Sequence, residues 1–299
     1  MSIAALLLAT ALAGQQASFR ALVDQDLRLA TIGDRLARGG SALCPGQATS
    51  SAGLVIQDAR QYAGGQRIAA RSALGLGKGP TIVAVIENGG GAAAGSDIAA
   101  VGGQPVLTDA RDAYADVERT EALIEEGLAR GSVALTLGSG AVATLHARPG
   151  CRSRFQIVRG GLGRTMADGR YVQISDAMMR TVANDNELAA VTAHELAQNI
   201  LRHRDRKTPS REAEYAADRL SVWLVARAGF DTGEIVPFWT RLGRRTDYGI
   251  FSDGTHPGWK KRVARLGEAV ALVERQRATG AAMLPPAEQQ SASQADFRR

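Results

Sequence analysis

A short polar motif inside an apolar stretch is the part of this sequence best suited to chemistry. Residues 184–203 read NDNELAAVTAHELAQNILRH, and Asn184 followed by Glu187 is typical of a helix N-terminus. In the predicted helix, His194 and Gln198 lie four residues apart on one face, and Glu195 follows the histidine directly. Two histidines at this spacing can share a metal ion, and the carboxylate can take a proton from metal-bound water. Here Gln198 stands where the second histidine would be.

A second predicted helix, over residues 208–229, carries two carboxylates at the same spacing. Thr208-Pro209 is typical of a helix start, and Glu214 and Asp218 lie four residues apart. Glu214 can serve as a further metal ligand, and Asp218 can hydrogen-bond a ligating histidine and orient it. The alternative for this pair is a solvated acidic face beside neighbouring arginines.

Two further histidines can be weighed by their positions. His203 lies nine residues beyond His194, about half a turn round the helix, so it cannot reach the same ion. His256, between Thr255 and Pro257, could complete a three-ligand set with His194 and Glu214 if it swings inward. The alternative is that His256 belongs to the start of a following helix.

The elements that must position these residues follow from hydrophobic periodicity. Residues 20–40 predict a helix that ends at Gly39-Gly40. Between about 52 and 147, glycine-rich turns separate short β-prone runs, and one amphipathic helix interrupts them; the strands are expected at 53–57, 81–86, 133–137 and 141–146, and the helix at 115–128. This texture predicts a small, partly open β-barrel. From Cys151 onward we expect one short sheet, with strands at 154–158 and 171–175, and several helices.

The composition is that of a soluble globular chain long enough for two domains, with 299 residues, 45% hydrophobic and 22% charged. The net charge of +6 comes from interspersed side chains, without a basic run carrying aromatics, so nucleic acid is not an expected partner. The tail, residues 281–299, is rich in Pro, Gln and Ser, which predicts disorder.

The N-terminus and the cysteines indicate export. Residues 1–17 include an apolar run from Ile3 to Ala13 with small residues at a plausible cleavage site, which predicts a signal peptide; an N-terminal buried or amphipathic helix is the alternative. No other stretch approaches the length of a membrane span, so we expect no integral membrane segment in the mature chain. In an oxidising compartment Cys44 and Cys151 would form a disulfide; otherwise they are two buried thiols.

These segments together resemble the HtpX-like and CAAX-prenyl-protease-like zinc metallopeptidases, a family of gluzincins. The resemblance runs from about 151 to 270 and rests on Glu187 to Val191 leading into Ala193 to Ala197, on Glu214 and Asp218, on ADRLSVWLVARAGFD (217–231), and on Thr255-His256-Pro257 with Arg262. It implies an α+β fold in which residues 151–280 form a mainly helical metallopeptidase domain with a small sheet. The family subset in question also has an upstream PDZ-like domain and a pair of cysteines.

Carried onto this chain, the resemblance implies one zinc ion bound by His194 and Glu214, with Gln198 at the third ligand position. Glu195 would be the general base and Asp218 would orient His194. His256 would be a catalytic residue near the site, a candidate to stabilise the oxyanion. The strand at 171–175 would be the edge on which an extended substrate pairs.

The region before the catalytic motifs resembles a PDZ domain over 51–150, after a helical segment at 18–50. Residues 81–106 (TIVAVIENGGGAAAGSDIAAVGGQPV) carry the bacterial PDZ pattern, and the turn at 74–77 is a candidate relic of its carboxylate-binding loop. A PDZ-shaped spacer without a ligand is the alternative.

Two functions follow from these expectations. The first is a periplasmic or secreted zinc metalloendopeptidase that hydrolyses peptide or unfolded-protein substrates with water activated by Glu195. The second is a pseudopeptidase, impaired because Gln198 replaces a histidine, that binds peptides without cutting them.

Overall fold

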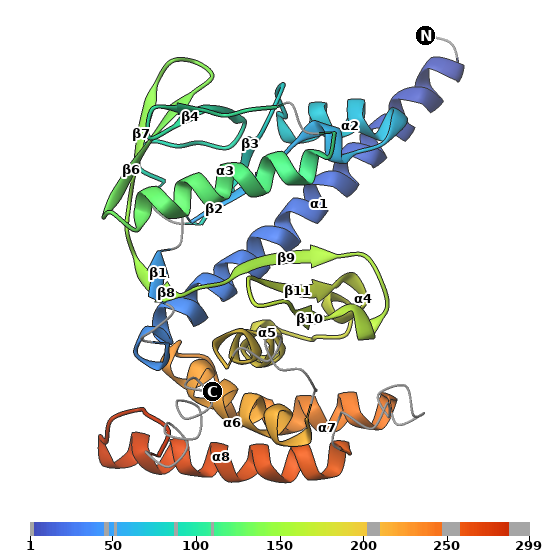
Figure 1. Cartoon of the computed structure of the whole chain (residues 1–299). Coiled ribbons are helices and arrows are strands. Elements are labelled where there is room, and N and C mark those ends of the chain that lie inside the picture. The colour runs from blue at the N-terminus through green and yellow to red at the C-terminus, as the bar shows by residue number, and fades with distance from the viewer. Residues whose placement is uncertain are drawn as a thin grey trace. The chain divides into compact units, whose positions relative to one another are not determined.

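The computed structural model describes residues 3–44, 48–50, 53–86, 89–108, 111–201, 210–246 and 258–286. The chain divides into two compact units: Met1–Thr31 with Thr49–Pro149, and Ile32–Ala48 with Gly150–Arg299. Helices and strands occur in both units, so the expected α+β class is confirmed (Figure 1).

Helix α1 (Ile3–Gly39) contributes to both units, and it ends where the glycine pair predicted. It includes the apolar run that predicts a signal peptide, continuous with the helix expected from residue 20. After α1 the chain turns closely onto the second unit, because a Cβ on Gly40 would overlap the side chain of Leu224. A short 3-10 helix, η1 (Ser41–Leu43), follows.

The first unit is built on an open antiparallel sheet. Its strands are β2 (Leu54–Gln57), β3 (Thr81–Val85), β4 (Ser96–Val101), β6 (Ser132–Leu137) and β7 (Val142–His146), hydrogen-bonded in the order β2-β3-β4-β6-β7, with β5 (Gln104–Pro105) also pairing with β4. Among the described strands β2 and β7 do not pair with each other, so the sheet stays open and the expected barrel does not close. All four predicted strands are present.

Helix α3 (Ala113–Leu128) covers the core of this sheet, where a helix was expected. Alternate residues of β6, Val133, Leu135 and Leu137, point inward and pack in one cluster with Ile124 and Leu128 of α3. Burying each such side chain contributes about 1.5–3 kcal/mol, so this cluster stabilises the packing of α3 on the sheet. Helix α2 (Gly64–Leu74) was not predicted, because its glycine-rich start hides the helical pattern.

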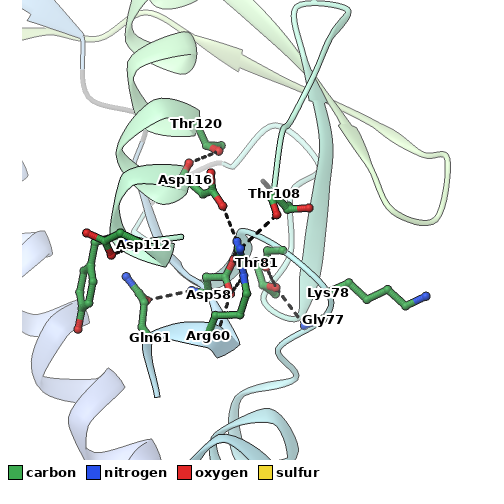
Figure 2. Close-up of polar contacts among 12 residues, drawn as sticks. Asp58, Arg60, Gln61, Gly77, Lys78, Thr81, Thr108, Asp112, Asp116 and Thr120 are labelled. Atoms are coloured by element: carbon green, nitrogen blue, oxygen red, sulfur yellow. Dashed lines mark hydrogen bonds and ion pairs between the residues drawn. The ribbon is translucent and has the colours of Figure 1, made fainter. Parts of the chain in front are cut away.

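A buried ion cluster ties the 3-10 helix η3 (Ala59–Gln61) to α3 within the first unit. The guanidinium of Arg60 donates to Asp58 at 2.7 Å and to Asp116 at 2.6 Å, and both carboxylates are fully buried. Figure 2 shows Arg60 between the two acids, with Thr108 supplying a backbone carbonyl as a further acceptor. Burial of the acids is thus compensated by a shared cation, and we name these three residues the Arg60 cluster.

The second unit combines a three-stranded sheet with a group of helices. Its sheet has the order β10-β11-β9, from β10 (Met166–Ala167), β11 (Tyr171–Ser175) and β9 (Arg154–Val158), with β9 parallel and β10 antiparallel to β11. The helices are α4 (Asp176–Met179), α5 (Asp185–Ile200), α6 (Arg211–Arg227), α7 (Ile235–Thr246) and α8 (Trp259–Thr279), with short 3-10 turns η4 (Leu162–Arg164) and η6 (Thr232–Glu234). Strands β1 (Ala48–Ser50) and β8 (Pro149–Cys151) form a separate pair.

One expectation about this sheet is wrong. Strand β11 was expected to be the edge for a substrate backbone, but it lies between β9 and β10. The backbone N–H of Ser175, at its end, donates to the hydroxyl of Thr165 at 3.1 Å. The chain therefore fills both sides of β11 itself, a long-range pairing that local sequence does not reveal.

The helices that carry the motifs begin at identifiable caps. The Asn184 side chain accepts from the N–H of Glu187 at the start of α5, as predicted. Helix α6 begins later than expected, because Ser210 is its N-cap; Thr208 and Pro209 lie outside the described residues. At the C-terminal end of α6, Gly229 adopts φ 73°, a left-handed conformation that glycine adopts without strain.

A disulfide joins Cys44 and Cys151, both in the second unit, as expected for an exported protein. It closes a loop with a sequence separation of 107 residues, so it restricts the unfolded chain strongly. The start of the tail is held to the helices: the carbonyls of Met283 and Leu284 accept hydrogen bonds from Arg227 and Gln276. Residues 287–299 of the predicted disordered tail lie outside the described residues.

Candidate active-site cluster

The centre of the candidate site is His194, on the almost fully buried helix α5. Its Nδ1 lies 2.9 Å from Oδ1 of Asp218, and its Nε2 lies 3.5 Å from Oε2 of Glu214. His194 is 3% exposed and Asp218 is fully buried. The i, i+4 spacing on α6 thus places one carboxylate at each ring nitrogen.

Gln198 lies one turn along α5 and faces the same point. Its Nε2 is 3.0 Å from Nε2 of His194 and 3.4 Å from Oε1 of Glu214. The amide therefore bridges the two strongest candidate ligands. Because an amide offers both donors and an acceptor, a half-turn of this group lets it pair with His194 in either protonation state.

Arg262, on α8, holds Asp218 with two hydrogen bonds. Its Nε and Nη2 donate to the two carboxylate oxygens at 2.8 and 2.7 Å, a bidentate geometry. Burial would raise the pKa of Asp218, but the charge and hydrogen bonds of Arg262, with His194, hold that pKa down at about 2. Asp218 is thus kept ionised and oriented toward His194. The sequence named Arg262 only as part of a resemblance, since its role depends on a contact between α6 and α8.

The electrostatic state of His194 follows from its neighbours. Burial alone would lower the pKa of His194, but the nearby carboxylates of Asp218 and Glu214 outweigh burial and raise the pKa to about 10. Burial would lower the pKa of Arg262, but the charge and hydrogen bonds of Asp218, together with the charges of Glu214 and Glu195, raise it above its ordinary value. Three buried carboxylates therefore surround one arginine and one histidine.

Trp239 of α7 is a member of this site that the sequence did not indicate. Its ring meets His194 edge-on with centroids 5.5 Å apart, and the guanidinium of Arg262 lies 4.5 Å from the Trp239 centroid. The aromatic ring thus packs against both the imidazole of His194 and the guanidinium of Arg262. No spacing rule connects Trp239 to the α5 motif, so only the packing of α7 reveals it.

The donor set can be compared with what a catalytic zinc ion requires. Such a site normally has three protein ligands and an open position for water. His194 Nε2 and Glu214 supply two donors, and the third position holds the Gln198 amide, a weak donor beside imidazole. Within the described ranges no group of three His, Cys, Asp or Glu side chains is placed to hold a metal. The described residues therefore do not complete a zinc site; His256 lies outside them.

The turn at 74–77, a candidate carboxylate-binding loop, uses its amides within the first unit. The N–H of Gly77 donates to Thr81 Oγ1 at 3.1 Å, and the N–H of Lys78 donates to Asp97 Oδ2 at 3.3 Å. Thr81 in turn donates to Asp97 Oδ1 at 2.6 Å. Figure 2 shows Gly77 and Thr81 in contact, with the Lys78 side chain extending away. The N–H groups of Gly75 and Leu76 donate to the carbonyl of Arg71, so the amides of this turn are already used by other groups of the chain.

Comparisons with other proteins give no family for this chain. No protein-family model matches it, and no curated protein matches it. Of the residues described, no helix is both long and apolar enough to cross a membrane.

Proposed function

We propose that this chain is a catalytically impaired relative of the zinc metallopeptidases that binds peptides or unfolded protein without hydrolysing them. The observation that carries the proposal is the Gln198 amide, 3.0 Å from His194 Nε2 and 3.4 Å from Glu214 Oε1. Gln198 stands at the position of a metal ligand, and its neutral amide links the two other candidate ligands, His194 and Glu214. Loss of even an outer partner of a metal ligand lowers metal affinity about 10–100-fold, so loss of a ligand lowers it further.

The surrounding residues support descent from a metal site. Asp218 orients His194, and Arg262 orients Asp218. Two packed helices do not need a buried ion cluster of this kind for their stability. A packed apolar replacement is often as stable as a buried ion cluster. We infer that the geometry is inherited from a scaffold in which His194 was a ligand.

Peptide binding is supported by the open sheet of the first unit. Strand β2 lies at the end of the strand order and therefore has one side without a strand partner in the described sheet. An extended peptide can add to such an edge through main-chain hydrogen bonds. The 74–77 turn is not the proposed contact, because its amides donate to Arg71 and Thr81.

The metal content of purified protein tests the impaired-site proposal. We expect plasma mass spectrometry to find no stoichiometric zinc, even after zinc is added back and excess removed. The matched variant Gln198→His restores the two-histidine motif, and we expect it to bind about one zinc per chain. One zinc in the unaltered protein would contradict the proposal, and no zinc in the variant would contradict the assigned ligand geometry.

Peptide binding is measured separately, by fluorescence anisotropy of a labelled, reductively unfolded casein and of its tryptic peptides. We expect saturable binding without cleavage in the presence or absence of zinc. The absence of binding by both probes would leave the impaired metal site without the proposed binding role and would contradict that half of the proposal.

A zinc metalloendopeptidase is the second candidate, favoured by one observation. Glu195 is buried, 6% exposed, directly after His194, the position from which a carboxylate can accept a proton from water bound beside that histidine. If zinc is bound, His194 and Glu214 would hold it, and Glu195 would accept a proton from the attacking water. Cleavage of casein that is lost in Glu195→Gln, with unchanged folding, would favour this candidate; cleavage that persists would exclude Glu195 as the base.

Export to the periplasm or outside the cell is proposed from the disulfide and the predicted signal peptide. A free-thiol assay on exported, denatured protein is expected to find no thiols before reduction and two after. Two thiols before reduction would contradict both the bridge and the oxidising location.

A further inference from the structure

A cavity of about 690 Å³ lies in the second unit, where helices α6 and α8 begin. Figure 1 shows these helices side by side. Its wall includes four basic side chains, one acid and one tyrosine: Arg211, Lys260, Lys261, Arg265, Glu212 and Tyr215. The cavity thus has a marked positive excess, and none of these residues belongs to the His194 cluster.

The start of α8 has features that an anion would stabilise. The first N–H groups of a helix have no partner within the helix, and they form its positive end. At α8 the N-cap Gly258 has no side-chain cap, and the first turn holds no acid. Instead Lys260 and Lys261 are exposed there, and within the described part of the chain neither makes an ion pair. Positive charge is therefore concentrated at the N-terminus of α8, where it is least favourable because that end of the helix dipole is already positive.

Helix α6, which begins at the same cavity, differs from α8. The Ser210 side chain caps it, and Glu212 and Glu214 lie in its first turn. The start of α6 thus has a side-chain cap and acids in its first turn, whereas among the described residues the start of α8 has neither. An anion in the basic cavity can accept from the N–H groups at the start of α8.

Tyr215 gives a second, independent indication of a ligand. The residue is 5% exposed and lines the cavity, and Arg265 lies 3.6 Å from its ring centroid. Its hydroxyl has no hydrogen bond to any residue that the structure describes. The hydroxyl of a tyrosine on the cavity wall can donate to an acceptor inside the cavity.

We propose that this cavity binds a phosphate-bearing anion. Four cations against one acid favour a ligand with two or more negative charges over a single carboxylate. Phosphate oxygens accept from arginine, lysine, tyrosine and helix N–H groups together, and all four kinds of donor are present here. The proposal is independent of metal binding at His194.

The test is calorimetric titration of the full chain with inorganic pyrophosphate, at ionic strength held constant with chloride. We expect saturation at one pyrophosphate per chain. Lys261→Gln should weaken binding about tenfold, as one charge-assisted contact is lost. Tyr215→Phe, which removes only the hydroxyl, should weaken it about threefold. Thermal unfolding checks that both variants fold.

Arg275→Gln is the matched control, because it removes one positive charge from an exposed position on the same helix outside the cavity. It should leave pyrophosphate binding unchanged. Equal weakening in Lys261→Gln and Arg275→Gln would show a diffuse charge effect and overturn the site. Absence of saturable binding would overturn it directly.

Vesicles of phosphatidylcholine with phosphatidylglycerol distinguish a lipid headgroup from a free phosphate compound. Vesicle binding that pyrophosphate displaces and Lys261→Gln weakens supports the site with a headgroup as ligand. Pyrophosphate binding without vesicle binding supports it with a free compound. Vesicle binding insensitive to both, together with no saturable pyrophosphate binding, overturns the proposal.

Discussion

The two units each contain a buried ion cluster, and the clusters differ in how they are completed. In the Arg60 cluster, one guanidinium serves Asp58 and Asp116 and also donates to the Thr108 carbonyl. The side chain of Arg60 is 28% exposed, so water solvates the rest of its charge. The acids sit on neighbouring elements and their bonds stay within the unit. This cluster is a structural tie.

In the cluster around His194, the neighbouring polar side chains converge on the imidazole ring. Its ring nitrogens face Asp218 and Glu214, and the Gln198 amide faces both Nε2 and Glu214. The guanidinium of Arg262 serves Asp218 from outside. Side chains that converge on one position from α5 and α6 indicate a site that binds, or once bound, a ligand. Side chains that form separate ion pairs indicate a purely structural role. Burial of charge by itself does not distinguish the two.

The largest effect that tests this comparison is expected for Arg262→Ala. It leaves fully buried Asp218 without its bidentate partner, and removing one member of a buried pair costs about 3–5 kcal/mol. Urea denaturation should show this loss in the free energy of unfolding. Arg130→Ala, which removes an exposed pair with Glu126, is the control and should change it by about 0.5 kcal/mol or less.

Arg60→Ala should have the next largest effect, about 1–3 kcal/mol. Two buried acids lose their shared donor, but Arg119 lies 3.4 Å from Asp116 and water reaches the exposed side. The same urea measurement applies. If Arg60→Ala lowers the free energy of unfolding as much as Arg262→Ala does, the greater solvent access of the Arg60 cluster does not reduce the cost of losing its arginine.

A third pair, Glu187 with Arg241, gives a pH-dependent test. Burial would raise the pKa of Glu187, but hydrogen bonds from Arg241 and from the N–H of Ala183 outweigh it and lower the pKa below its ordinary 4.5. A lowered folded-state pKa adds stability above pH 4.5 that is lost as the pH falls through the folded value. Glu187→Gln should cost about 1–1.5 kcal/mol at pH 7. The difference from the unaltered protein should shrink below pH 4.5, and a constant difference would contradict the assignment.

The smallest effect is expected for Gln198→Met, which keeps the volume and removes the amide. Loss of the contacts with His194 and Glu214 should cost about 1 kcal/mol in the free energy of unfolding, measured with urea. Unchanged stability would mean that the amide is not a cross-link and would weaken the proposal of an impaired site.

The sequence by itself determined the local features of both units. The period of apolar residues and the caps located α3 and α5, and the alternating pattern located β6 and β11. The i, i+4 spacing put His194 with Gln198, and Glu214 with Asp218, on common faces. These results depend on helix and strand geometry, which acts over a few residues.

The tertiary structure decided the features that depend on distant segments. The open sheet, the position of β11 between two strands, and the bond from the N–H of Lys78 to Asp97 all require contacts between segments distant in the sequence. Arg262 and Trp239 join the His194 cluster only because α7 and α8 pack against the helices that carry the motifs. Such contacts are set by the shared burial of whole helices, and the spacing of residues within one segment holds no record of them.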